Sequence, residues 1–463
     1  MPEQTPPNLE IDGFRLGACI HSGAQGQIFS VISPERGFPM IMKVPRIGPG
    51  EPSENLISFE TEALIMPALS GPYVPRFVAT GNLSKMPYLV TEWVDGESLE
   101  NVLKRGILPP PEVARIGALI ADAVYDLHLQ DVIHLDLKPD NIVLRTGGGV
   151  ALIDFGLAHH ANFPDLLAEE KRYAAGSAPY VSPEQVLGTR SDPRSDIFSL
   201  GVVLYEMATG KLPFGVPQTL AGMRDRLWLD PVPPRMRARE LPPSLQEIIL
   251  RCLEPDADER YLSPAHLAFD LRRPFQVALT GRAIKSTQAG FLTQARRWWR
   301  ARKDRMGIRL RPPAHSGTAP VIMVAVDTTH PDDPRQPALQ RATAQVLSLS
   351  PEYRLICVSV VGSRSVTENA SNKHLEHLVR LRHWIEPLGL PPWRLSLHVI
   401  EALGPEGALI EFARSNHVDM ILIGAPSPTQ QTLAWWRSVA SSVTANAPCS
   451  VYVVRVPEPQ SAS

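Results

Sequence analysis

Residues His134–Asn141 read His-Leu-Asp-Leu-Lys-Pro-Asp-Asn, and Asp154-Phe155-Gly156 follows them closely. The first stretch puts a carboxylate, an ammonium and an amide on one short loop, and the second adds another carboxylate. Transfer of a phosphoryl group to a hydroxyl needs this set: a group that orients the hydroxyl, a cation near the moving phosphate, and oxygen ligands for magnesium. The two stretches together therefore indicate phosphoryl transfer and predict a fold that brings them into one site.

Length and composition set the limits for the rest of the chain. Its 463 residues predict two or three domains at about 150 residues each, and 44% of them are hydrophobic, enough for real cores. The formal net charge of −2 provides no general attraction for nucleic acid. The four cysteines form no Cys-x-x-Cys pair, which argues against a zinc site or a disulfide framework; they are Cys19, Cys252, Cys357 and Cys449.

The N-terminal residues Met1–Glu10 are polar and lack the apolar centre of a signal peptide. No apolar run approaches the roughly 18 residues that a membrane-spanning helix needs. Together with the scattered cysteines, these observations predict a cytoplasmic protein.

The hydrophobic pattern changes twice along the chain. Over residues 12–100, short apolar runs alternate with turns, and one helical stretch at Leu56–Leu69 interrupts them. From about residue 109 the pattern becomes helical. We therefore expect a small β-rich lobe at 12–94 and a helical lobe at 95–275. The expected strands are 14–16, 27–31, 40–44 and 88–94, and the expected helices are 111–129, 195–209 and 244–253.

After a linker at 276–318, β-branched runs alternate with helical ones. Alternating strands and helices predict a parallel sheet covered by helices, a doubly wound α/β domain at 319–457. The expected strands are 321–326, 354–361, 394–400, 420–424 and 450–455.

With the motifs quoted above, the chain resembles the eukaryotic-type protein kinases, and Lys-Pro-Asp-Asn is the form typical of serine/threonine kinases. The resemblance implies the α+β bilobal kinase fold, with ATP and Mg²⁺ or Mn²⁺ as cofactors. The reaction would move the γ-phosphate of ATP to serine or threonine hydroxyls of proteins. Asp136 would orient the hydroxyl, Lys138 would neutralise the moving phosphoryl group, and Asn141 and Asp154 would hold the metal.

The resemblance also assigns an ATP site to the small lobe. Lys43 corresponds to the strand lysine that holds the phosphates, and Glu62 is its expected partner on a helix, with Glu60 as the alternative. The loop His21–Ile28 is glycine-rich, although His21 stands where the family prefers its first glycine. The remaining nucleotide contacts would come from Ile20, Gly23, Gly26 and Ile28, and from backbone groups of Glu92 and Val94.

Four further residues resemble the structural frame of a kinase: Ser177 in the substrate floor, Glu184 at the end of the activation segment, Asp196 beneath the catalytic loop, and Arg260 as the partner of Glu184. Every catalytic polar residue of the family is present, which argues against a pseudokinase. The alternative is a catalytically weak, nucleotide-responsive scaffold that signals through the C-terminal domain. Only His21 and Leu135 speak for it.

Leu135 stands where many regulated kinases have an arginine that binds an activation-loop phosphate. Between Asp154 and Glu184 there is no threonine, and the only serines are Ser177 and Ser182, both in the substrate-floor motif. The arginine that would bind a phosphate is therefore absent, and so is a serine or threonine outside the substrate-floor motif that could carry it. The hypothesis is that the kinase does not need loop phosphorylation.

The linker is strongly basic. Residues 282–311 contain ten Lys or Arg and one acidic residue, a net charge of +9, around Trp298 and Trp299. Such a segment can contact an anionic membrane surface, but a solvated tether whose tryptophans pack on a neighbouring domain is favoured. Specific nucleic-acid binding is not expected.

The last domain resembles the universal stress protein family in its opening strand, in the run Val418–Gly424 and in its ending. Nucleotide-binding members carry further glycines at the positions of Ser427 and Arg437, so side chains would intrude where a phosphate approaches the backbone. Gly424, Ser438 and Asp327 do fit that pattern. The resemblance implies a sensory or dimerising module, with homodimers formed through the last strand.

Overall fold

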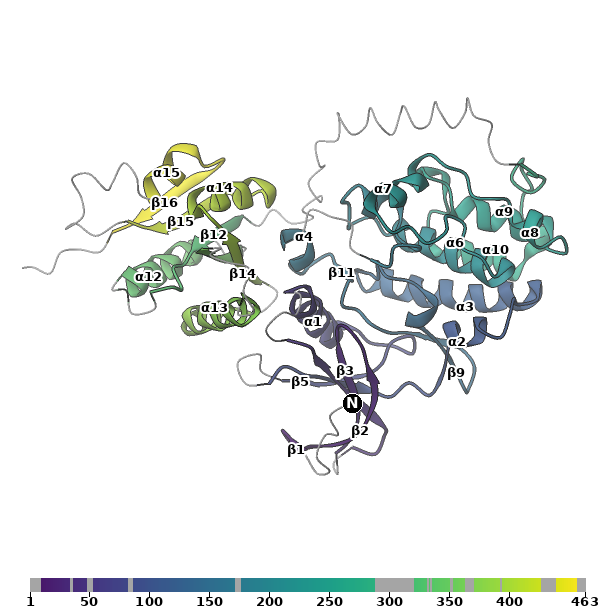
Figure 1. Ribbon diagram of the computed structural model, residues 1–463, viewed down its shortest axis with the longest axis horizontal. Helices are drawn as coiled ribbons and strands as arrows, with labels where there is room; N and C mark the ends of the chain where they lie inside the picture. The colour runs from purple at the N-terminus through teal and green to yellow at the C-terminus, as the bar shows by residue number, and fades with distance from the viewer. Residues whose placement is uncertain are drawn as a thin grey trace, which may run out of the picture.

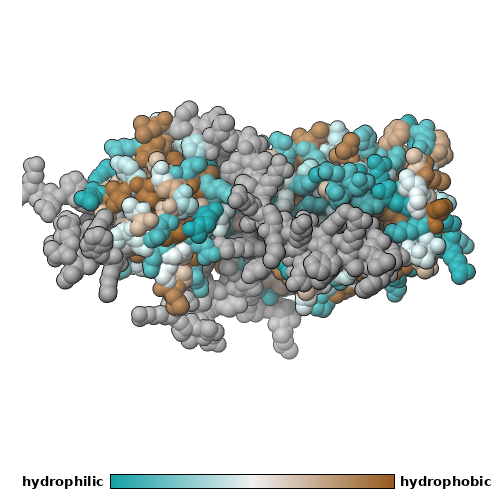
Figure 2. Space-filling view, turned by 90° about the horizontal axis from the view of Figure 1, so that it is seen from above, coloured by the Kyte–Doolittle hydropathy of each residue, from teal (hydrophilic) through white to brown (hydrophobic). Residues whose placement is uncertain are grey.

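The computed structural model contains two kinase-like lobes and a separate C-terminal α/β domain (Figure 1). It describes residues 10–33, 36–47, 53–81, 86–170, 176–287, 320–330, 333, 335–349, 353–362, 370–391, 394–425 and 439–455. Hydrophilic and hydrophobic residues are interleaved on the surface of both bodies (Figure 2), as on proteins generally. No helix in these ranges is long and apolar enough to cross a membrane.

The small lobe is a six-stranded antiparallel sheet with the order β1-β2-β3-β4-β6-β5. Helix α1 (Ser53–Ile65) lies beside it and continues into a short 3-10 helix, Met66–Ala68, where Pro67 interrupts the α-helix. The alternate buried residues of the strands form a core of their own, which includes Phe14, Phe29, Met42 and Val90. The strands are β1 (Glu10–Ile11), β2 (Phe14–Ser22), β3 (Gly26–Ile32), β4 (Met40–Pro45), β5 (Phe77–Thr80) and β6 (Leu89–Glu92).

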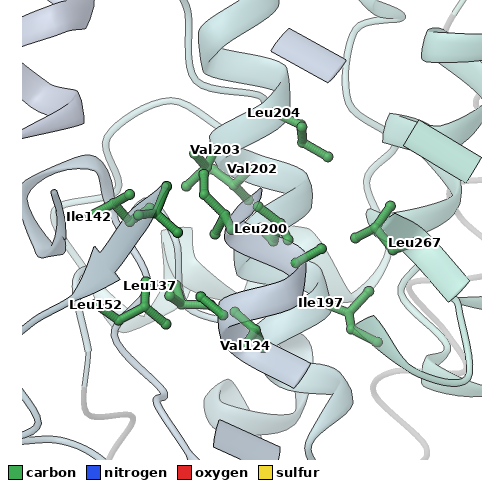
Figure 3. Packing of buried hydrophobic residues seen from close by; sticks show 14 of the residues in the cluster. Val124, Leu137, Ile142, Leu152, Ile197, Leu200, Val202, Val203, Leu204 and Leu267 are labelled. Atoms are coloured by element: carbon green, nitrogen blue, oxygen red, sulfur yellow. The ribbon is translucent and has the colours of Figure 1, made fainter. Parts of the chain in front are cut away.

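The large lobe is built on two long helices, α3 (Pro110–Leu129) and α6 (Arg194–Thr209), which pack with α9 and α10 around a buried aliphatic core (Figure 3). A Cβ on Gly201 would lie 2.5 Å from Cys252 Cβ, so glycine allows α6 and α9 to approach closely. The other helices are α2 (Leu99–Leu103), α4 (Leu166–Glu170), α5 (Pro183–Val186), α7 (Leu220–Met223), α8 (Pro234–Arg237), α9 (Pro243–Cys252) and α10 (Pro264–Arg272).

Short strands support the loops that carry the signature motifs. β9 pairs with β7 and β10, and β8 pairs with β11, all antiparallel. The loop His134–Asn141 runs from β8 to β9, and Asp154 follows β10, so these small sheets bring the two motifs together. The strands are β7 (Gly96–Ser98), β8 (Val132–Ile133), β9 (Ile142–Arg145), β10 (Val150–Leu152) and β11 (His159–His160).

The C-terminal domain has a five-stranded, fully parallel sheet with the order β14-β13-β12-β15-β16. Helices α12 (Arg335–Ser348) and α13 (Ala370–Ile385) pack on one face, and α14 (Pro405–Ser415) and α15 (Val439–Asn446) on the other. This is the predicted doubly wound α/β fold. The strands are β12 (Val321–Ala325), β13 (Arg354–Gly362), β14 (Leu395–Ala402), β15 (Met420–Gly424) and β16 (Ser450–Val454).

The predicted fold class is confirmed, with small shifts at element ends. Helix α1 begins at Ser53 rather than Leu56 and becomes 3-10 after Ile65. The predicted strand 88–94 ends at Glu92, before the connection to the large lobe. Trp298 and Trp299 of the basic linker lie outside the described residues.

Candidate active site

Asp136, Lys138 and Ser177 form one hydrogen-bonded network. The Ser177 backbone N–H donates to Asp136 Oδ1 at 2.8 Å, and Lys138 Nζ donates to Asp136 Oδ2 at 2.8 Å. Lys138 Nζ also donates to Ser177 Oγ at 2.9 Å. The substrate-floor serine predicted from the sequence is therefore tied to both catalytic-loop residues, although it lies about forty positions further along the chain. A carboxylate and an ammonium are thus fixed beside the segment on which a substrate would rest.

Asn141 is oriented by its amide nitrogen. Its Nδ2 donates to the Asp136 carbonyl at 3.0 Å and to Asp136 Oδ2 at 3.1 Å, which uses both amide hydrogens. The amide oxygen is therefore the group left to act as a ligand. An amide oxygen and a carboxylate are suitable donors for Mg²⁺ or Mn²⁺, which prefer oxygen ligands, so Asn141 and Asp154 fit the cation that the family implies.

Asp154 is held ionised. Burial alone would raise the pKa of this carboxyl, but the Lys43 ammonium outweighs burial and lowers the pKa to about 2. Asp154 also adopts a left-handed backbone conformation, with φ of 65°. Such a conformation costs free energy in a residue other than glycine and is found where the surrounding structure imposes it.

Lys43 links the two lobes. Its Nζ lies 2.6 Å from Glu62 Oε2 on α1 and 2.9 Å from Asp154 Oδ1 in the large lobe. Glu62 Oε1 also accepts the Phe155 backbone N–H at 3.3 Å. Burial would lower the pKa of Lys43, but Asp154 and Glu62 together raise it above its ordinary value. Glu62, rather than Glu60, is therefore the helix residue that pairs with the strand lysine.

Asp196 anchors the catalytic loop from below. Its carboxylate accepts the backbone N–H groups of His134 and Leu135, both at 2.9 Å, and lies 3.0 Å from His128 Nε2. Leu135 has a φ of 61°, and Gln185 Nε2 donates to its carbonyl at 2.8 Å. These bonds offset the backbone strain at Leu135 and so fix the position of Asp136.

Arg260 and Glu184 form a buried ion pair. Two guanidinium nitrogens of Arg260 lie 2.7 and 3.1 Å from the carboxylate oxygens of Glu184, and the Arg260 side chain is fully buried. Arg260 also donates to the carbonyls of Glu254, Pro255 and Arg194. With its charge paired and its donors satisfied, this group joins the end of the activation segment to α6.

The glycine-rich loop turns tightly between β2 and β3. The Gly23 N–H donates to the Gly26 carbonyl at 2.9 Å. A Cβ on Gly26 would lie 2.4 Å from the Val44 carbonyl, so this position requires glycine. Ile20 is 43% exposed and Ile28 is partly buried, which leaves part of the Ile20 side chain open to contact a ligand.

The connection between the lobes begins at Glu92. Its N–H donates to the Arg76 carbonyl, and the Trp93 N–H donates to the Pro39 carbonyl. Among the described residues, none has a backbone hydrogen bond to Val94. Of the two residues whose backbone groups are predicted to contact adenine, Glu92 is thus the last residue of β6 and Val94 lies two residues beyond it.

In the C-terminal domain, Asp327 lies shortly after the end of β12, and Gly424 is the last residue of the neighbouring parallel strand β15. The Asp327 carboxylate is occupied by Thr329 and His330, with the Thr329 N–H donating at 2.9 Å. Ser427, Arg437 and Ser438 lie outside the described residues.

Several supporting residues were not predicted from the sequence. His128 on α3 contacts Asp196, and Arg226, which is almost fully buried, donates to the carbonyls of Ala178 and Val181 in the substrate floor. Gln185 completes a capping box with Ser182 at the start of α5, and the pattern Ser-x-x-Gln is a signal that the sequence does contain. His128 and Arg226 carry no comparable local signal.

The protein kinase domain family model matches residues 14–269, more than half of the chain. The universal stress protein family model matches residues 320–455. The chain therefore belongs to the protein kinase family and carries a universal stress protein domain at its C-terminal side.

The curated relatives are bacterial serine/threonine kinases. A probable serine/threonine-protein kinase of Clostridium perfringens is 34% identical over 216 residues, covering 46% of this chain and 31% of the relative. The serine/threonine-protein kinase PknB of Mycobacterium leprae is 31% identical over 274 residues, covering 58% of this chain and 44% of the relative. The chain thus spans less than half the length of these relatives. Among solved structures, the PknI kinase domain of Mycobacterium tuberculosis covers 58% of this chain and 100% of its own, at 20% identity and a TM-score of 0.48.

Proposed function

We propose that the protein is a serine/threonine protein kinase that transfers the γ-phosphate of ATP to serine or threonine hydroxyls of proteins. The observation that carries the proposal is the joining of two networks. Lys43 binds both Glu62 and Asp154, while Lys138 binds both Asp136 and Ser177. Membership of the protein kinase family and the bacterial serine/threonine kinase relatives support the same class.

Each residue has a role in this proposal. Lys43 positions the α- and β-phosphates, and Asp154 and Asn141 hold Mg²⁺ or Mn²⁺, which neutralises charge on the phosphates when bound. Asp136 orients the attacking hydroxyl and accepts its proton. Lys138 stabilises charge on the transferred group. Ile20, Gly23, Gly26 and Ile28 cover the nucleotide, and the backbones of Glu92 and Val94 bind adenine.

The proposed chain organisation is a kinase domain at 12–275, a basic linker at 276–318 and a universal stress protein domain at 319–457. The reaction is proposed to take place in the cytoplasm, where ATP is available and the four free cysteines stay reduced. The ion pairs Lys43–Glu62 and Lys43–Asp154 weigh against the alternative of a catalytically weak scaffold, because both nucleotide-positioning contacts are made.

The C-terminal domain is proposed to act as a sensor or a dimerisation module. β16 is the edge strand of its sheet and Tyr452 on it is 47% exposed, which leaves the strand available to a second copy. A membrane contact through residues 282–311 receives little support from the described part of this segment. There, Arg282 pairs with Glu254 and Glu247, and Lys285 pairs with Asp230, which favours a tether that starts on the large lobe.

Transfer of phosphate from labelled ATP with Mg²⁺ or Mn²⁺, to the protein itself and to a generic basic protein, tests the proposal. We expect label on serine or threonine from the wild type and none from Asp136→Asn, which keeps the size of the side chain. ATP binding without transfer in the wild type would contradict the kinase function and favour the scaffold.

A further inference from the structure

The C-terminal domain contacts the two kinase elements that control activity in this fold class. Helix α1 carries Glu62, and helix α4 (Leu166–Glu170) lies within the activation segment, between Asp154 and Glu184. In Figure 1, α1 and α4 lie next to each other and face the edge of the C-terminal sheet formed by β14. The contacts below join these elements directly.

The polar part of the contact centres on Glu169 of α4. Its carboxylate forms ion pairs with Arg354, the first residue of β13, and with His398 on β14. The side chains of Glu169 and His398 are only 4% and 1% exposed. Burial lowers the pKa of Arg354 to about 10, with Asp165 acting in the opposite direction, so the guanidinium remains charged at neutral pH. A carboxylate buried to this extent is costly unless it is paired, and the two ionic partners that the described residues provide both come from the other domain.

The apolar part of the contact centres on Leu56 of α1. Leu56 is 4% exposed and belongs to the same apolar cluster as Val399 of β14 and the helices α12 and α13. Ile47, which lies after β4, packs against this cluster, as do Leu395 and Leu397 of β14. Phe59, one helical turn further along α1, belongs instead to the core of the large lobe. Helix α1 is therefore held between the large lobe and the C-terminal domain.

The kinase lobes themselves hold the activation segment by a second carboxylate. Asp165 lies 2.9 Å from Arg190 Nε and 3.2 Å from His159 Nδ1, and Arg190 also donates to the Leu157 carbonyl at 2.9 Å. Arg190 and His159 keep the pKa of Asp165 below its usual range although burial opposes this. The segment thus presents a carboxylate at each of two anchors, Asp165 and Glu169, while Leu135 provides no cation for a phosphate.

We propose that the C-terminal domain is an activating partner of the kinase within the same chain. Its pairing of Arg354 and His398 with Glu169, and its burial of Leu56, hold the activation segment and α1 in the arrangement that forms the Lys43–Glu62 ion pair. The built-in carboxylate of Glu169 replaces an activation-loop phosphate as the group that is captured. Glu169 and Leu56 act as positioning residues. This inference rests on the proposed kinase function, and any signal that displaces the C-terminal domain would lower activity.

The test uses the full chain with Arg354→Glu, which opposes Glu169 with a like charge. We expect kcat to fall about tenfold or more, since breaking a buried ion pair is strongly destabilising, and hydrogen exchange in α4 and α1 to become faster. Glu169→Arg should act in the same direction. The double variant Glu169→Arg with Arg354→Glu should recover kcat to within about threefold of the wild type, because the ion pair is restored with its charges exchanged.

The matched control is Arg414→Glu, an exposed arginine of α14 in the same domain, which should change neither kcat nor exchange. Glu169→Gln is the conservative variant and replaces Arg354→Glu in the test if that variant fails to fold. It should give an intermediate loss of kcat. Unchanged kcat and unchanged exchange in the single variants would overturn the inference, as would a rise in kcat, which would mean an inhibitory contact. If the wild type transfers no phosphate, the proposed function fails. Hydrogen exchange in α4 and α1 of the same variants then tests the interdomain contact without reference to activity.

Discussion

The catalytic loop and the activation segment meet at the hydrogen bond between Asp136 and Ser177, yet different parts of the chain hold them in place. The catalytic loop is fixed by Asp196, His128 and Gln185, all within the large lobe. The activation segment is fixed partly within that lobe, through Asp165 and Arg190, and partly by Arg354 and His398 of the C-terminal domain.

Because of this difference, the residues that carry out the reaction and the residues that hold the activation segment are supported by different parts of the chain. The catalytic-loop groups Asp136 and Asn141 are held by neighbours in the large lobe that fold with them, so their geometry does not depend on the second domain. The segment that presents the substrate depends on a contact between residues separated by more than 180 positions along the chain. Variants of the groups that act in the reaction should therefore abolish phosphate transfer, and variants of the residues that hold the activation segment should reduce it.

The largest expected effect comes from Asp154→Asn. Because the amide is a weaker ligand and carries no charge, the stabilisation supplied by the metal, worth several kcal/mol, should be lost. We expect kcat/KM to fall by about 10³-fold, measured with labelled ATP at saturating Mg²⁺. Nucleotide affinity without metal should change little. Activity within tenfold of the wild type would exclude Asp154 as a metal ligand.

The second effect concerns stability. Arg260→Met leaves the Glu184 carboxylate without its buried partner, and breaking such a pair costs about 3–5 kcal/mol. Hydrogen exchange of the α6 amides should show this loss in the free energy of unfolding of the large lobe. Adding Glu184→Gln should recover part of it, because no uncompensated charge then remains. If the losses in the free energy of unfolding from Arg260→Met and Glu184→Gln simply add in the double variant, the ion pair is not the cause of the destabilisation.

The third effect is expected in the glycine-rich loop. Gly26→Ala places a Cβ against the Val44 carbonyl, and such overpacking costs about 1–3 kcal/mol. The loop must move, so KM for ATP should rise about tenfold while kcat changes less. Gly37→Ala is the control in the same lobe, because a Cβ there meets nothing within 4 Å. Equal KM values for the two variants would mean that the loop does not contact the nucleotide.

The smallest effect is expected at the contact between the two regions. Ser177→Ala removes one of the two partners that the described residues give Lys138, a hydrogen bond worth about 0.5–1.5 kcal/mol. We expect kcat to fall about two- to tenfold. Ser177→Thr keeps the hydroxyl and should behave like the wild type. A loss of similar size in both variants would show that the space around Ser177, rather than its hydroxyl, is what matters.

Local patterns predicted most of the fold. Strand β15 has the predicted bounds Met420–Gly424, and α3 begins one residue before its predicted start. Long periodic segments could be predicted because each of them buries one continuous apolar face. The short strands β7 to β11 were not predicted, since two to four residues contain too little periodicity to distinguish a strand from a loop.

The same limit applies to the site. The resemblance to the protein kinases implied Glu62 over Glu60 as the partner of Lys43, because Glu62 fits the register of that family better. In the structure, Lys43 and Glu62 form an ion pair. It gave no sign of the contact between Glu169 and Arg354, because nothing local distinguishes these charges from solvated ones. Only the packing of the second domain buries them and makes them partners.

One measurement tests most directly whether the active site is complete without a phosphate on the activation segment. Protein made together with a phosphatase, and shown by mass to carry no phosphate, is mixed with ATP, Mg²⁺ and a generic basic protein. If the site is complete without a loop phosphate, transfer of phosphate to the basic protein is linear in time from the first turnover. A lag that preincubation with ATP removes, with phosphate found between Asp154 and Glu184, would contradict it.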